Sequence, residues 1–254
     1  MFFIQNPLAQ FEIRDLIILD FPLLNNIHLS LTNIAGYLAI SFIIITTMNI
    51  MTNKNANLIH RNWNLSKECI HDTIFSIVIN QINKNKGQIY FPFIITLFMF
   101  ILVNNLIGMV PYSFSTTSHF VLTFSLSFTI VLGVTILGLV EHNIKFFSLF
   151  VPAGCPLVLL PALVLIEFLS YLARNVSLGL RLAANVLSGH MLLNILSGFT
   201  FKIMTSGFIY FFVGLLPLSF IIAFSSLELA IAFIQAQVFV VLTCGYIKDS
   251  LELH

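Results

Sequence analysis

The sequence predicts an all-α, polytopic membrane protein, and the composition and hydropathy of the chain carry that prediction. Of its 254 residues, 58% are hydrophobic and 8% are charged, with a mean hydropathy of +1.00. Soluble domains carry about 25% charged residues. Uncharged stretches recur at about the 20 residues that a helix needs to cross a bilayer. We therefore expect a single integral membrane domain over residues 1–254, with the lipid bilayer as its surroundings.

The same composition excludes several classes of protein. A net charge of +1 provides no basic field for nucleic acid. Cys69, Cys155 and Cys244 lie far apart without metal-ligand spacing, so we expect free thiols, no metal and no cofactor. No G-x-x-x-x-G-K-[ST] loop is present, so the chain alone should not bind or hydrolyse ATP.

The first half of the chain predicts one span and one surface helix. Residues 1–29 are mixed in character and predict no span, whereas residues 31–51 predict the first transmembrane helix. In residues 63–82 the apolar positions recur every three or four residues, which predicts an amphipathic helix at the membrane surface. Five cations in residues 52–89 mark the inner side, so the N-terminus is expected outside.

Residues 90–110 and 120–140 predict a transmembrane hairpin around an uncharged turn. Asn104 and Asn105 lie within its first arm. They either line a path for protons or water or make hydrogen bonds between helices, and the second interpretation is favoured.

Two long helices are predicted after a proline-rich stretch, over residues 162–196 and 203–247. At about 1.5 Å per residue, the first is about 52 Å long against a hydrocarbon core of about 30 Å. We therefore expect a strongly tilted, membrane-embedded helical hairpin.

Arg181 is the residue of the first long helix that most strongly indicates a functional site. A guanidinium at bilayer depth costs at least roughly 2.5–3.5 kcal/mol, so an arginine there indicates a functional site. Small residues four apart, Gly179 with Ala183 and Ala184 with Ser188, allow another helix to approach closely. The alternative is a snorkelling or structurally paired arginine. The small neighbours favour a counter-charge on a partner.

Polar residues recur along this helix on one face. Glu167, Arg174 and Arg181 are spaced by seven residues, and Asn185 follows four residues later. Seven residues fall about 20° short of two turns, so the four side chains form a slowly rotating stripe about 27 Å long.

A second set of titratable side chains lies away from that stripe. His190 is nine residues after Arg181, about 180° around the helix axis, while Glu228 and Gln235 are seven apart on the last helix and can face it. Carboxylates and imidazole exchange protons, whereas arginine keeps its charge and cannot relay them. The pattern indicates a split proton path past a fixed cation, with the moving acid on another subunit.

Five segments resemble subunit a of the F-type ATP synthases, in its mitochondrial form. They are NPLAQFEIR (residues 6–14), NLIGMVPYSF (105–114), FVPAGCPLVLLP (150–161), SLGLRLAANVLSGH (177–190) and LELAIAFIQAQVFVVLTCGYIKD (227–249). The resemblance implies a proton-translocating stator subunit, not catalytic alone, that forms two offset half-channels against a rotating ring of c subunits. It also implies contacts with the peripheral stalk and other membrane-sector subunits.

The resemblance also implies roles for particular residues. Arg181 would face the carboxylates of the ring, with Asn185 beside it and Gln235 near it. His190 and Glu228 would stand in the half-channel open to the intermembrane space. Glu167 would lie toward the matrix exit. Enterobacterial relatives exchange the residue types at the His190 and Glu228 positions, which favours a mitochondrial or an alphaproteobacterial source. We therefore expect the mitochondrial inner membrane, with a bacterial inner membrane as the alternative.

Two alternatives belong to other classes. A proton-coupled secondary transporter also buries Glu, His and Arg, but usually shows internal repeats, and the two halves of this sequence are not self-similar. A haem-bearing electron carrier needs facing histidines at membrane depth. His190 is at that depth, whereas His119 and His142 flank a span. An absorbance spectrum separates this class from the others.

Overall fold

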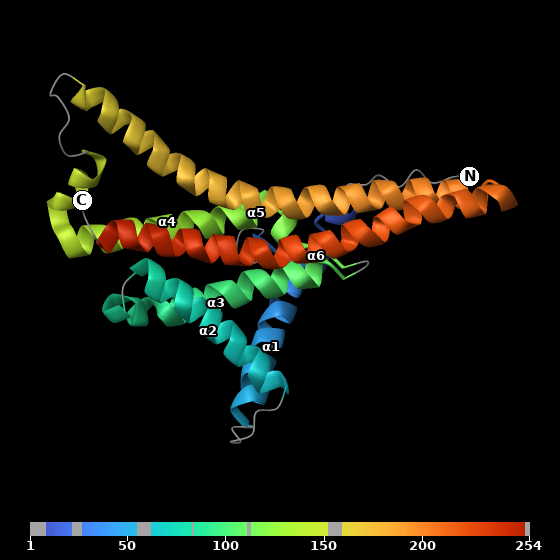
Figure 1. Cartoon of the computed structure of the whole chain (residues 1–254), viewed down its shortest axis with the longest axis horizontal. Helices are drawn as coiled ribbons and strands as arrows, with labels where there is room; N and C mark the ends of the chain where they lie inside the picture. The colour runs from blue at the N-terminus through green and yellow to red at the C-terminus, as the bar shows by residue number, and fades with distance from the viewer. Residues whose placement is uncertain are drawn as a thin grey trace. The chain divides into compact units, whose positions relative to one another are not determined.

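The computed structural model describes residues 9–21, 27–54, 62–82, 84–110, 113–151 and 159–251. Five of its helical segments are long and apolar enough to cross a membrane, and α2 is not one of them. The elements are, in order, η1 (Ala9–Phe11), β1 (Asp15–Phe21), β2 (Ile27–Thr32), α1 (Asn33–Lys54), α2 (Asn62–Ile82), α3 (Lys84–Gly108), η3 (Thr116–Ser118), α4 (Phe120–His142), η4 (Asn143–Phe150), α5 (Leu160–Thr205) and α6 (Phe208–Leu251) (Figure 1).

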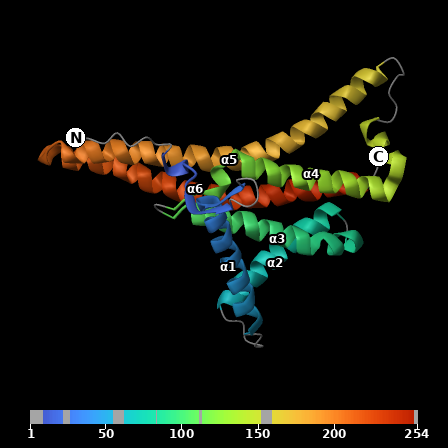
Figure 2. The same ribbon diagram turned by 180° about the vertical axis from the view of Figure 1, so that it is seen from behind.

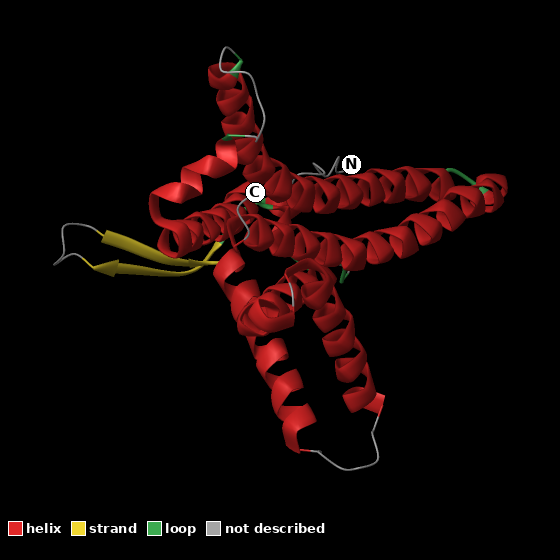
Figure 3. Ribbon diagram, turned by 60° about the vertical axis from the view of Figure 1, so that its left-hand side comes forward, coloured by secondary structure: helices red, strands yellow, loops and turns green. Residues whose placement is uncertain are grey.

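A β-hairpin precedes the first helix, where the sequence patterns predict no element. Strands β1 and β2 pair antiparallel, from Asp15 with Thr32 to Phe21 with Ile27 (Figure 3). The strands read DLIILDF and IHLSLT, and their β-branched and aromatic residues suit extended backbone. A run of this length is too short to cross a bilayer as a helix, so hydropathy alone did not reveal it.

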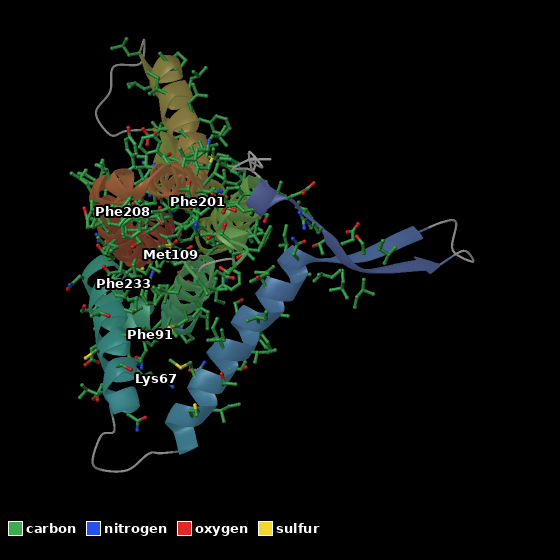
Figure 4. The ribbon with its side chains drawn as sticks, turned by 90° about the vertical axis from the view of Figure 1, so that its right-hand side faces the viewer. Lys67, Phe91, Met109, Phe201, Phe208 and Phe233 are labelled. Atoms are coloured by element: carbon green, nitrogen blue, oxygen red, sulfur yellow. The ribbon has the colours of Figure 1, made fainter. Side chains whose placement is uncertain are left out.

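The side chains of α2 differ in burial from one face of the helix to the other. Ile74, Val78 and Ile82 are buried, while Leu65 on the same helix is 55% exposed. Phe91 of α3 packs edge-on against aromatic rings of α2, including Phe75 with ring centroids 5.5 Å apart. Figure 4 labels Phe91 on α3 and Lys67 on α2. One face of α2 is therefore packed within the protein, and its place at the membrane surface stays a prediction.

Helices α5 and α6 are longer than their predicted ranges of 162–196 and 203–247. They have 46 and 44 residues. At about 1.5 Å per residue these lengths are about 69 and 66 Å, more than twice the roughly 30 Å of a hydrocarbon core. Pro217 lies inside α6 without ending it. A short turn at residues 206–207 joins the two helices, which Figure 2 shows from behind.

The chain forms two compact units. Unit 1 comprises Met1–Ile50, Phe100–His119 and Ala183–Gln235, and unit 2 comprises Met51–Met99, Phe120–Leu182 and Ala236–His254. Helices α1, α3, α5 and α6 contribute residues to both. Each unit therefore contains part of the polar stripe that the sequence predicts on α5.

Candidate functional site

In unit 1 the second part of α5 and the first part of α6 run antiparallel, and two contacts between them involve predicted site residues (Figure 1). The amide Nδ2 of Asn185 donates a hydrogen bond to Oε1 of Gln235 at 3.0 Å. One turn further on, Gly189 lies against the carboxyl group of Glu228, and a Cβ added at Gly189 would be 2.7 Å from the Cδ atom of Glu228. The carboxyl group of Glu228 fits at this position because Gly189 has no side chain.

A cavity of about 230 Å³ lies between these helices and the end of α3. Asn185, Glu228 and Gln235 all line it, together with Asn105 and Met109 of α3. The predicted polar residues of α5 and α6 in unit 1 therefore share one space.

A larger cavity, of about 810 Å³, reaches the same carboxyl group. His190 and Glu228 both line it, as do polar residues of the next two turns of α5, Asn194 and Ser197. Met109, labelled in Figure 4, lines both cavities, as Glu228 does. Glu228 is thus the titratable residue that the two cavities share.

Several buried polar atoms around these cavities have no hydrogen-bond partner among the described residues. They are Nε2 of His190, both carboxylate oxygens of Glu228, Nε2 of Gln235 and Oδ1 of Asn105. Most buried polar atoms in folded proteins are paired. Here the unpaired ones include an acid and an imidazole, which are groups that exchange protons.

Asn104 and Asn105 have different partners. Asn105 donates through Nδ2 to the carbonyl of Ala232 on α6 at 3.3 Å, which is the hydrogen bond between helices that the sequence favours. Asn104 accepts from the hydroxyl of Thr116 at 3.1 Å and donates to the carbonyl of Phe100 at 2.8 Å. Asn104 therefore joins α3 to η3, whereas Asn105 both joins helices and lines the smaller cavity.

In unit 2, Arg174 joins two carboxylates. Its Nη1 donates to Oδ2 of Asp249 at 3.0 Å, and its Nη2 lies 3.8 Å from Oε1 of Glu167. The Glu167 and Asp249 side chains are 42% and 48% exposed. The sequence predicts Glu167 as a site residue but not Asp249. Extending the seven-residue spacing of Glu228 and Gln235 by two steps reaches position 249, so a signal for Asp249 was present.

Arg181 is exposed, and the structure records no ion pair between it and another described residue. Leu180, Ala184 and Ser188 are exposed on neighbouring positions of α5. Gly179 behaves differently, since an added Cβ would be 2.9 Å from the Ser127 hydroxyl of α4. Of the two small pairs expected to admit a partner helix, the one containing Gly179 thus packs within the chain, while Ala184 and Ser188 remain open.

Long apolar helices, together with a buried acid that lines two cavities, are the features of a polytopic membrane protein with titratable side chains in its interior. Comparison with known proteins gives its family. The chain belongs to the family described as ATP synthase A chain, whose sequence profile matches residues 35–248.

Curated relatives agree over nearly the whole length. ATP synthase subunit a of Penicillium chrysogenum is 68% identical over 252 residues, 99% of this chain and 98% of its own length. The Emericella nidulans protein of the same name is 69% identical over 252 residues, with the same coverage. That of Eremothecium gossypii is 47% identical over 253 residues, covering 100% of this chain and 96% of the relative.

Family membership states the function in general terms. The chain is the proton-translocating stator subunit of the membrane sector of an ATP synthase, is not catalytic alone, and works with other subunits of that complex. Its fungal relatives and membrane-spanning helices place it in the mitochondrial inner membrane. The secondary transporter is thereby excluded.

Proposed function

We propose that protons enter this subunit through the larger cavity at His190 and pass by way of Glu228 into the smaller cavity. The position of Glu228 carries the proposal, because this one acid lines both cavities and its carboxylate oxygens are buried without a partner among the described residues. An acid held by no other side chain can take up a proton on one side and release it on the other. Asn185 and Gln235 then form the inner wall of the path.

Arg181 is the barrier in this path. It lies one turn before Asn185 on α5 and keeps its charge at any physiological pH. A fixed cation repels a proton, and it favours the charged form of any carboxylic acid brought beside it. A carboxylate of the c-subunit ring that reaches Arg181 therefore releases its proton there and takes up another from the Glu228 side.

The proton leaves through a second half-channel at Glu167. Arg174 holds Glu167 and Asp249 together, and each carboxylate is about half exposed. Carboxylates in contact with water accept protons and pass them on. Entry by Glu228 and exit by Glu167 are offset half-channels, and the turning ring connects them.

The partners follow from the exposed surface. The ring of c subunits contacts the face of α5 that carries Arg181, Ala184 and Ser188, because small residues beside the arginine permit close approach. Peripheral-stalk and other membrane-sector subunits cover further apolar side chains, of which α1 and α6 expose many.

Glu228→Gln tests the proposal. The amide keeps the shape of the side chain but cannot carry a proton, so proton-driven ATP synthesis should fall by about 100-fold, the usual worth of a positioned acid–base group. Glu68→Gln, an exposed acid on α2, is the matched control. Synthesis is measured in membrane vesicles and normalised to assembled complex. An unchanged rate in Glu228→Gln contradicts the proposed path.

A further inference from the structure

A segment before β1 forms part of the wall of the larger cavity. Gln10, Glu12 and Arg14 line this cavity, and so does Asn33, the first residue of α1. The same cavity reaches His190. Residues far apart in the sequence thus enclose the space from which His190 is approached.

Asn33 makes three hydrogen bonds that join residues 12–14 to the start of α1. Its backbone N–H donates to the carbonyl of Arg14 at 3.0 Å, and its Oδ1 accepts from the backbone N–H of Arg14 at 2.7 Å. Its Nδ2 donates to the carbonyl of Glu12 at 3.1 Å. Two of the three bonds come from the side chain, so the position of residues 12–14 depends on asparagine at position 33.

The segment also touches the imidazole. The ring of Phe11 meets the ring of His190 edge-on, with centroids 6.4 Å apart and an interplanar angle of 71°. A shift of residues 12–14 would therefore move Phe11 relative to His190.

Glu12 and Arg14 are charged, exposed residues in the lining of this cavity. Their side chains are 64% and 70% exposed, and Nη2 of Arg14 is 3.4 Å from Oε2 of Glu12. An ion pair this exposed contributes little to stability. Charged side chains favour contact with water, and the five cations of residues 52–89 predict that the N-terminus lies on the outer side.

From these contacts we infer that residues 10–14 form the outer wall of the proton entrance. Asn33 is the positioning residue that holds this wall against His190. The inference rests on the proposed path through His190 and Glu228, and it adds a part of the chain to which that path assigns no role. Protons would reach His190 through water in this entrance.

Asn33→Ala in the whole complex tests the positioning role. ATP synthesis is measured against external proton concentration, with internal pH and membrane potential held constant. The external proton concentration that gives half-maximal rate should shift severalfold while the rate at saturating protons changes less. Asn33→Asp keeps the acceptor for Arg14 but sets a carboxylate oxygen against the carbonyl of Glu12, so it should shift the proton dependence in the same direction as Asn33→Ala. Thr46→Ala is the control, since the partners of its hydroxyl among the described residues are two carbonyls of α1, those of Phe42 and Ile43.

Glu12→Cys tests the wall directly. A bulky, membrane-impermeant thiol reagent added from the outer side attaches to the new thiol and fills the entrance, so synthesis should be largely lost. Leu16→Cys, 64% exposed and outside the described walls of the cavity, is the matched control. The parent chain, which has three cysteines of its own, is treated in parallel.

Glu228→Gln, measured beside these variants, distinguishes failure of the proposed path through His190 and Glu228 from failure of the proposed entrance wall. If Glu228→Gln is slow while Asn33→Ala and fully labelled Glu12→Cys behave like their controls, the entrance wall is refuted and the path stands. If Glu228→Gln is normal, the path fails and the inference falls with it. A proton-dependence shift in Asn33→Ala together with block of labelled Glu12→Cys supports the wall.

Discussion

Gly189→Ala perturbs the proton path by one methyl group. The added Cβ would overlap Oε1 of Glu228 and would lie 2.7 Å from its Cδ and 3.1 Å from its Cγ. Ordinary contacts between carbon atoms are about 3.5–4.0 Å. The carboxyl group must therefore move by about 1 Å, away from the wall that it shares with both cavities.

A displacement of about 1 Å in a catalytic group can cost about 100-fold in rate. We expect proton-driven ATP synthesis by the assembled Gly189→Ala complex to fall by up to that amount. Stability should change little, because the displaced group is the end of a side chain, and alanine in a helix interior is favoured over glycine by about 0.5–1 kcal/mol.

Gly198→Ala is the matched control, on the same helix and in the same unit, since an added Cβ there meets nothing within 4 Å. Both variants are assayed in vesicles at equal amounts of assembled complex, with passive proton leak measured in parallel. Equal synthesis rates in the two variants would refute the reasoning that the position of the Glu228 carboxyl group limits proton transfer.

Three other predictions concern separate parts of the chain. Arg181→Lys should abolish coupled synthesis in an assembled complex, because lysine lacks the planar guanidinium and can lose its charge when desolvated; retained synthesis would make this arginine mainly structural. Asn104→Leu removes the partner of the buried Thr116 hydroxyl and should destabilise the subunit by about 1–3 kcal/mol, seen as a lower thermal unfolding temperature of the solubilised complex; an unchanged temperature contradicts it. Asp249→Asn weakens the pair with Arg174 and should slow proton exit, and a parental synthesis rate would remove Asp249 from the exit path.

Hydropathy and helical periodicity are enough to predict the class of the protein and the helix face on which each polar residue lies. An apolar stretch of about 20 residues crosses a bilayer whatever surrounds it, so hydropathy predicts membrane helices directly. The helical repeat is equally local, so the spacing of Glu167, Arg174 and Arg181 on α5 follows from 3.6 residues per turn. Arg181, Ala184 and Ser188 are exposed on that helix, whereas Gly179 and Ala183 are buried.

Which polar residues contact one another depends on the packing of the helices. Asn185 bonds Gln235 across 50 positions of the sequence, and Arg174 bonds Asp249 across 75. Periodicity assigns each residue to a face of its own helix but does not give the register of one helix against another. That register depends on close contacts such as Gly189 against Glu228. The wall formed by residues 10–14 beside His190 depends likewise on the hydrogen bonds of Asn33, which no local pattern encodes.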